Sequence, residues 1–264
     1  MRLPIVQIDA FASEAFKGNP AAVMPLAAWL DDGVLQAIAA ENNLSETAFL
    51  LPDESGAADF ELRWFTPVSE VALCGHATLA SGHFVLSSDP ERDAVTFRTR
   101  KAGILSVTRS GDGYELALPA WPPVPTAMPE IVAALGVEAV ETLWRDGGYR
   151  VVVVADEATV RGIVPDLRAL AQGGDRQTIV TAPGDSTDVV SRMFAPGAGI
   201  DEDPVTGSAH SVIVPYWAKR LGRDHFTAYQ ASARGGHLTC RLDGDRVVLG
   251  GTCVTVIEGT FFLG

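Results

Sequence analysis

The sequence predicts an α+β fold made of two related halves, each a group of short strands around one apolar helix. Two observations lead to this prediction. Ordered segments of the first half recur about 130 residues later, which is the signature of a duplicated module. Five prolines fall within the eleven residues 119–129, where neither a helix nor a central strand can continue. We therefore place a linker at 119–129 between halves 1–118 and 130–264, and the last strand of the second half could pack on the first.

Two segments in each half carry the repeat. The sequence RWFTP at 63–67 recurs as RMFAP at 192–196, and acidic residues follow each copy. A Gly-x-Ala sequence then opens an apolar run, GHATLA at 75–80 and GSAHSV at 207–212. Further on, GILS at 103–106 matches GHLT at 236–239. Two ordered matches at nearly equal separation favour duplication over chance.

Strands are predicted where apolar and polar residues alternate between turn residues, at 5–11, 60–65, 94–98, 104–109 and 114–118. Glycine-containing turns at 110–113 and 243–245 predict hairpins. Helices are predicted at 29–42, 75–85, 128–135 and 206–221, where capping, acidic or proline residues mark the starts. The helices at 75–85 and 206–221 are apolar on most sides, so we expect strands to wrap around each of them.

Composition excludes several classes of partner. Lys and Arg number 20 against 33 Asp and Glu, a formal net charge of −13. This charge disfavours nucleic acid and anionic membrane surfaces, whereas local donors can still hold a small anionic substrate. The apolar runs are only strand-length and the N-terminal run contains Asp9, so neither a membrane span nor a signal peptide is predicted. We expect a cytoplasmic protein.

Three cysteines, Cys74, Cys240 and Cys253, are an odd number without paired spacing. They do not form the pattern of a disulfide framework, and the spacing of a zinc site is missing. We therefore expect no bound metal.

The two apolar helices begin at comparable points of the repeat. Helix N-termini offer unpaired N–H groups and the positive end of the dipole, which suits a carboxylate in a predicted cleft between the halves. His76 stands at the first start, and Asp203 and Ser208 stand at the second. Taken singly, Asp203 is explained as a helix cap and His76 as a core or surface histidine. Their equivalent placement favours a functional role.

Glu46 precedes an apolar strand. If buried there it can serve as a general acid or base, and if exposed it is an ordinary strand-end glutamate.

Motifs along the whole chain resemble the PhzF-like family of phenazine-biosynthesis isomerase relatives. They are, in order, DAF at 9–11 with GNPAAV at 18–23, LSET at 44–47, CGHAT at 74–78, EDPVTGSA at 202–209 and QASARGG at 230–236. The resemblance implies a diaminopimelate-epimerase-like fold with two pseudo-symmetric halves, a homodimer and no cofactor.

The resemblance also implies site residues. Glu46 would move a proton between two carbons of a small carboxylated substrate, and His76 and Asp203 would assist or orient. The substrate-binding residues implied by the resemblance are Asn19, Ser45, Gly75, Ala77, Thr206, Gly207 and Ser208.

Two departures keep other functions open. The phenazine enzymes proper carry Gly-His-Pro where this chain has GHA at 75–77. Related epimerases and racemases use one cysteine in each half, but only Cys74 is present here, and 203–207 has none. A one-thiol mechanism that pairs Cys74 with Asp203 or Glu46 stays open, since a helix start lowers a thiol pKa. The alternatives to a Glu46 isomerase are an amino- or hydroxy-acid racemase that uses Cys74 and a non-catalytic carboxylate-binding protein.

Overall fold

The computed structural model describes residues 1–264, which form two compact units. The first unit comprises Met1–Ala117 and Gly250–Gly264, and the second comprises Leu118–Leu249. Residues 250–264, placed with the second half in the sequence-based division, therefore belong to the first unit. Residues 119–129, expected as a linker, are part of the second unit.

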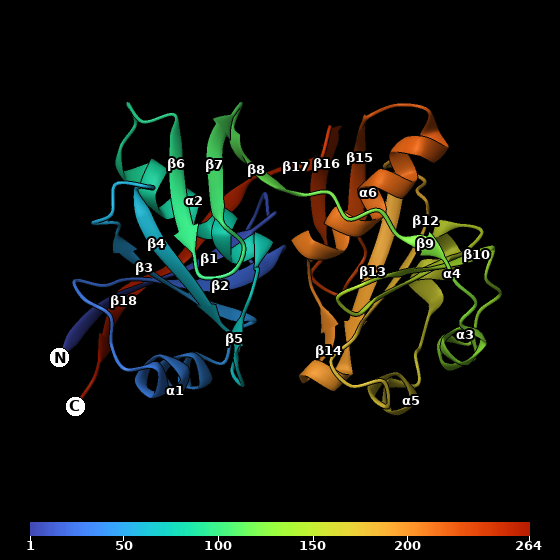
Figure 1. Ribbon diagram of the computed structural model, residues 1–264, viewed down its shortest axis with the longest axis horizontal. Helices are drawn as coiled ribbons and strands as arrows, with labels where there is room; N and C mark the ends of the chain where they lie inside the picture. The colour runs from blue at the N-terminus through green and yellow to red at the C-terminus, as the bar shows by residue number, and fades with distance from the viewer. The chain divides into compact units, whose positions relative to one another are not determined.

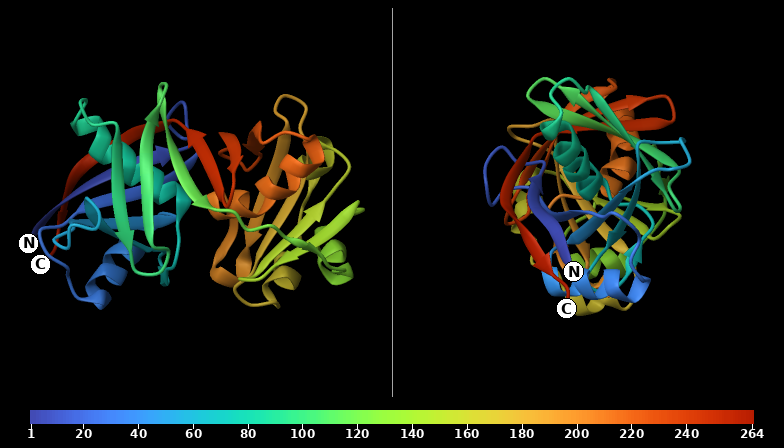
Figure 2. Two further views of the ribbon diagram at one scale, coloured as in Figure 1. Left: turned by 45° about the horizontal axis from the view of Figure 1, so that its top comes forward. Right: turned by 90° about the vertical axis from the view of Figure 1, so that its left-hand side faces the viewer.

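The first unit is a strongly curved sheet (Figure 1). Its strands pair in the order β18, β1, β2, β3, β4, β6, β7, β8, with parallel pairs β2–β3 and β4–β6 and antiparallel pairs elsewhere. Strand β18 lies beside β1, so the two chain ends are neighbours (Figure 2). The elements are β1 (Arg2–Ala10), β2 (Asn19–Pro25), α1 (Asp32–Asn42), β3 (Glu46–Pro52), β4 (Phe60–Phe65), β5 (Glu70–Val71), α2 (Gly75–Ser88), β6 (Ala94–Thr99), β7 (Ile104–Ser110), β8 (Gly113–Pro119) and β18 (Cys253–Phe262).

Helix α2 is the centre of this unit. It contacts β1, β2, β3, β6, β7 and β18, and its residues are buried without interruption from Gly75 to Gly82. A Cβ atom at Gly82 would lie 2.4 Å from a methyl carbon of Val107, so only glycine lets β7 approach this closely. The expectation that strands wrap an apolar helix is confirmed.

The second unit repeats the same order of pairings. Parallel pairs β11–β12 and β13–β15 alternate with antiparallel pairs β10–β11, β12–β13 and β15–β16. Helix α6 takes the place of α2 and is buried from Gly207 to Val214. The elements are β9 (Val124–Pro125), α3 (Pro129–Leu135), β10 (Glu141–Arg145), β11 (Tyr149–Val153), α4 (Glu157–Gly162), α5 (Leu167–Ala171), β12 (Gln177–Pro183), β13 (Val189–Ala195), the 3₁₀ helix η1 (Pro196–Ala198), β14 (Ile200–Asp203), α6 (Gly207–Leu221), β15 (His225–Gln230), β16 (Gly236–Asp243) and β17 (Arg246–Gly251).

The equivalent pairings confirm the predicted fold of two related α+β halves, each with a curved sheet around a helix. Each unit also has its own apolar core. Met24, Leu35 and Phe49 belong to a cluster in the first unit, and Val180 and Phe194 belong to one in the second. No helix of the protein combines the length and the apolar character that a membrane crossing requires.

The proline-rich segment is anchored to α6 by a hydrogen bond that a proline in the helix makes available. Pro215 lies inside α6 and has no N–H to give to the carbonyl of Ser211, one turn earlier. The Trp121 N–H donates to that carbonyl instead, at 2.9 Å. The proline-rich residues 119–129 are thus tied to the second unit through Trp121.

Candidate active site

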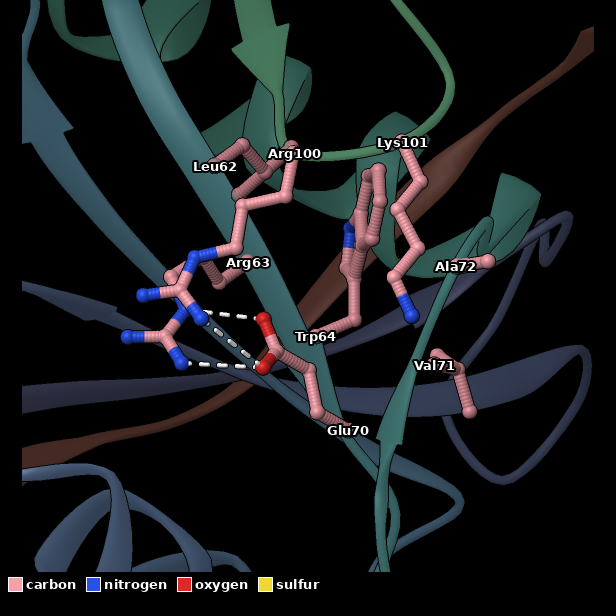
Figure 3. A pocket seen from close by; sticks show the side chains of 8 residues that line it. All are labelled: Leu62, Arg63, Trp64, Glu70, Val71, Ala72, Arg100 and Lys101. Carbon is pink, nitrogen blue, oxygen red and sulfur yellow. Dashed lines mark hydrogen bonds and ion pairs between the residues drawn. The ribbon is translucent and has the colours of Figure 1, made fainter.

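An arginine–glutamate pair holds the segment that leads into α2. Arg63 on β4 donates from Nε and Nη2 to the two carboxylate oxygens of Glu70 on β5, at 2.8 and 2.9 Å. Arg100 donates to the same carboxylate at 3.2 Å, as Figure 3 shows. Arg63 is only 3% exposed and also stacks on Phe65. A planar, bidentate pair of this kind fixes direction as well as distance, so it restrains the start of α2.

The second unit repeats this pair at the matching position of the duplication. Arg192 on β13 donates from Nε and Nη2 to the two carboxylate oxygens of Glu202 on β14, at 2.7 and 2.9 Å, and stacks on Phe194. Among the acidic residues that follow each copy of the repeat, Glu70 and Glu202 are thus structural partners of its arginine. They position the starts of α2 and α6.

Helix α2 begins without a capping side chain. Its N-cap is Cys74, in an extended conformation, and the Thr78 hydroxyl donates to the Cys74 carbonyl. Gly75 and His76 are therefore the first two helical residues, with backbone N–H groups that have no partner inside the helix. Helix α6 begins in the same way at Gly207, with Thr206 as N-cap and the His210 ring on the Thr206 carbonyl at 2.8 Å.

Glu46 and His76 form a buried pair. Glu46 is the first residue of β3, and its Oε2 lies 3.0 Å from Nε2 of His76. Glu46 is 8% exposed and His76 3% exposed, so the interpretation of Glu46 as an exposed strand-end glutamate is wrong. Asn19, the first residue of β2, lies on the other side of the imidazole, with Nδ2 3.1 Å from Nδ1.

The Cys74 thiol also faces Nδ1 of His76, at 3.6 Å from sulfur to nitrogen. Burial and the Glu46 carboxylate raise the pKa of Cys74 to about 11, and the Ala77 N–H and His76 only partly oppose this. The expectation that the helix start lowers this pKa is therefore wrong, because desolvation outweighs the helix N-terminus. Burial alone would lower the pKa of His76, but Cys74 and Glu46 together raise it well above its usual value.

Glu46, Cys74 and His76 each offer a ligand atom for a metal ion, and these atoms lie within 4.8 Å of one another. However, the imidazole faces Cys74 with Nδ1 and Glu46 with Nε2. A metal ion bound to Nδ1 would be next to the Cys74 thiol and away from the Glu46 carboxylate, and an ion bound to Nε2 would have the opposite neighbours. The arrangement is a row of side chains along the two edges of the imidazole ring, which differs from a tetrahedral ligand set.

In the second unit, a compact network surrounds Asp203. The Thr206 hydroxyl donates to the Asp203 carboxylate, and the Thr206 N–H donates to the side-chain oxygen of Gln230 at 2.9 Å. Gln230 is fully buried and donates to the Asp203 carbonyl at 2.7 Å. Asp203 is therefore not the helix cap that its sequence position suggested, because Thr206 occupies the N-cap position.

Ser208, the second residue of α6, occupies the place that His76 has on α2. Its hydroxyl lies 3.4 Å from the side-chain oxygen of Gln177, the first residue of β12. Burial raises the pKa of Tyr149, and the Ser208 and Gln177 side chains oppose this rise. Gln177 thus matches Glu46 in its place at the start of a strand paired in parallel with the preceding one. Only the first unit has a carboxylate and an imidazole at these two places.

The structure therefore gathers Asn19, Gly75 and Ala77 around the Glu46–His76 pair at the start of α2. Ser45 precedes Glu46 and is half-buried. Thr206, Gly207 and Ser208 surround the start of α6 in the second unit.

Sequence reasoning missed Gln177, Gln230, Tyr149 and His210. Comparing the two halves also at the strand that begins with Glu46 would have identified Gln177 as its counterpart in the second half. Cys240 and Cys253 lie on β16 and β18, and burial raises the pKa of Cys253 to about 12.

Comparisons with known proteins agree with this arrangement. Residues 8–259 match the PhzC-PhzF model, described as phenazine biosynthesis-like protein. An uncharacterized isomerase of Pseudomonas aeruginosa is 48% identical, with all of both chains covered. A crystal structure of a PhzF family phenazine biosynthesis protein from Enterococcus faecalis is 46% identical, with a TM-score of 0.91 and full coverage of both chains.

A hydroxyproline epimerase from Agrobacterium vitis shares the fold at 14% identity, with a TM-score of 0.61 and coverage of 98% of this chain and 92% of that one. The family match spans nearly the whole chain, and the relatives match over their full length. The chain therefore belongs to the phenazine biosynthesis-like (PhzC-PhzF) family and is an isomerase.

Proposed function

We propose that the protein moves a proton between two carbons of a small carboxylated substrate without a cofactor, with Glu46 as the general acid and base. The observation that carries the proposal is the buried Glu46–His76 pair at the start of α2. His76 holds one carboxylate oxygen at 3.0 Å, which leaves the other oxygen to take and return a proton. The helix N-terminus beside it supplies preorganised donors for the negative charge that develops.

The asymmetry of the duplication supports one shuttle group over two opposed bases. The second unit carries Gln177 and Ser208 where the first carries Glu46 and His76. An amide and a hydroxyl with no adjacent base cannot take a proton from carbon at neutral pH. A single carboxylate that accepts a proton and returns it elsewhere fits an isomerisation.

The second candidate is a racemase or epimerase that uses Cys74. Its support is the position of the thiol at the N-cap of α2, 3.6 Å from His76. Against it stands the pKa of about 11, which leaves little thiolate at neutral pH. The third candidate, a carboxylate-binding protein without activity, would use the same donors and perform no proton transfer.

Deuterium wash-in tests these candidates. The protein is incubated in D₂O with dihydro-3-hydroxyanthranilate and a panel of small amino and hydroxy acids, and mass and optical rotation are followed. We expect Glu46→Gln to slow exchange by about 10²- to 10⁴-fold, the usual contribution of a general acid–base group. Glu54→Gln, in an exposed turn, is the matched control and should exchange as the parent does.

The outcomes separate the candidates. If the parent protein changes the optical rotation of a panel compound, and only Cys74→Ser loses the exchange of deuterium, the reaction would be assigned to the thiol. Tight binding of a panel compound without exchange would favour the binding protein. Asp203→Asn tests the assisting role that the family resemblance implies. Light scattering tests the homodimer, which should have twice the 27.9 kDa mass of the chain.

A further inference from the structure

Asn19 is fully buried and lies at the edge of the His76 ring that is turned away from Glu46. It starts β2 directly after Gly18, which has a φ of +63°. A Cβ atom at Gly18 would lie 2.1 Å from the Ala10 carbonyl oxygen, so the turn before Asn19 requires glycine. The local backbone therefore fixes where the Asn19 carboxamide sits.

We propose that Asn19 is a positioning residue that assigns the proton of neutral His76 to Nε2, the nitrogen facing Glu46. The Asn19 Nδ2 atom is 3.1 Å from Nδ1 of His76. An amide nitrogen donates hydrogen bonds and does not accept them, so Nδ1 must present its lone pair. The ring proton is then on Nε2, which lies 3.0 Å from the Glu46 carboxylate. This inference rests on the proposed role of Glu46.

Cys74 supplies a second donor to the same nitrogen. Its sulfur lies 3.6 Å from Nδ1, within the range of a hydrogen bond to sulfur. Burial raises the pKa of the thiol to about 11, so the thiol keeps its proton at neutral pH and can donate it. Two donors from different elements, β2 and the N-cap of α2, thus converge on Nδ1.

This tautomer matters for the base. With the proton on Nε2, the N–H group of His76 lies beside Glu46 Oε2, at 3.0 Å between nitrogen and oxygen, and attracts the carboxylate without neutralising it. With the proton on Nδ1 instead, the Nε2 lone pair would face an anionic oxygen at 3.0 Å and repel it. An imidazolium would form a full ion pair with Glu46 and weaken it as a base.

Two titratable groups face the imidazole, Cys74 at the start of α2 and Glu46 at the start of β3. Burial opposes the imidazolium, whereas Glu46 and Cys74 favour it, so the pKa of His76 lies well above its usual value and the neutral ring forms only at higher pH. The Asn19 amide acts in the same direction as burial, because its N–H competes with a proton for the Nδ1 lone pair.

Nitrogen-15 NMR of the histidine rings tests the assignment without any substrate. The chain has five histidines, and the signals of His76 are identified by their loss in His76→Gln. We expect a protonated Nε2 and a bare, hydrogen-bonded Nδ1 in the parent protein at pH values above the titration of His76, where the ring is neutral. Asn19→Asp offers only an acceptor and should protonate both nitrogens, whereas Asn19→Leu offers neither and should give mixed tautomers.

Asn42→Asp is the matched control. Asn42 donates to the Thr47 hydroxyl, beside Glu46 in the chain, at 3.1 Å, and makes no hydrogen bond to His76. The His76 ring signals and the deuterium exchange rate of the Asn42→Asp variant should equal those of the parent protein. In the wash-in assay, both Asn19 variants should lower kcat by about 2- to 10-fold, the usual effect of one hydrogen bond between neutral groups. Asn19→Asp should regain activity as the pH rises and the imidazolium loses its proton.

A neutral His76 ring that carries its proton on Nδ1 in the parent protein overturns the inference, even if no Asn19 variant folds. Unchanged ring signals in Asn19→Asp, or the same change in Asn42→Asp, overturn it as well. Normal kcat in the Asn19 variants, alongside loss of exchange in Glu46→Gln, refutes the positioning role and leaves the proposed function intact. If no compound exchanges at all, the proposed function fails while the ring signals still decide the tautomer.

Discussion

Replacing Arg63 by lysine should loosen the start of α2 while keeping the charge. Arg63 makes three hydrogen bonds to carboxylates, two to Glu70 and one to Asp32 at 2.8 Å. The Asp32 carboxylate is 66% exposed, so solvent screens that contact and we neglect it. Lysine can replace one of the two bonds to Glu70 but cannot form the bidentate pair.

The expected cost follows from the remaining bond. A hydrogen bond to a charged group contributes about 1.5–3 kcal/mol, and Glu70 keeps the Arg100 contact at 3.2 Å. We therefore expect the free energy of unfolding to fall by about 1–3 kcal/mol, measured by urea titration at pH 7. Arg241→Lys is the matched control, because the pair of Arg241 with Asp243 is exposed and should change stability by less than about 0.5 kcal/mol.

Hydrogen exchange locates the effect. Arg63→Lys should speed amide exchange in the first turn of α2 and leave α6 unchanged, whereas Arg192→Lys should do the reverse. The pH dependence gives a further check. The hydrogen bonds of Arg63 hold the pKa of Glu70 below its usual value of 4.5, so this pair stabilises the fold above that pH and less as the pH falls below it. If Arg63→Lys matches Arg241→Lys in both assays, the positioning argument is refuted.

Three further predictions follow from single sites. Burial lowers the pKa of His210 to about 4, so between pH 6.5 and pH 4 the unfolded chain binds a proton that the folded protein excludes. The free energy of unfolding should therefore fall by up to about 3 kcal/mol as the pH falls from 6.5 to 4. His210→Gln should remove this pH dependence of stability in urea titrations. Gly82→Ala should destabilise the protein by about 1–3 kcal/mol in thermal unfolding, because its Cβ meets Val107, whereas Gly33→Ala, with open space around it, should not. Exchange activity should survive dialysis against EDTA, and a loss that Zn²⁺ reverses would instead assign a metal to the Glu46 cluster.

Much of the fold was predictable because duplication and apolar patterning are properties of the chain itself. Helix α6 begins one residue from the predicted start and α2 at it, and β4 matches its predicted range. For the proline-rich segment, the sequence shows which regular structure proline prevents but not which tertiary hydrogen bond proline makes possible. The carbonyl that Pro215 leaves open on α6 accepts the Trp121 N–H, a tertiary contact with no local signature.

The candidate site was predictable only in part, for a similar reason. Position in the repeat suggested His76, whereas a place directly before an apolar strand, together with the family resemblance, suggested Glu46. Their 3.0 Å contact depends on the parallel pairing of β2 with β3, which brings the start of β3 beside the start of α2. The raised pKa of Cys74 was missed because a helix start suggests the opposite sign, and only the observed burial shows that desolvation prevails.

The duplication shows how the proposed proton shuttle, Glu46, can be placed on a frame that both units share. Both units keep the same arginine–glutamate pair before the central helix and the same side-chain bond to the N-cap carbonyl. They differ at the first residue of one strand and the second residue of the helix, where Glu46 and His76 stand in one unit and Gln177 and Ser208 in the other. The frame therefore does not require an ionisable pair at these places, since the second unit folds without one. A buried carboxylate that the fold does not need costs stability, and its presence in one unit alone is the pattern expected of a group that serves chemistry.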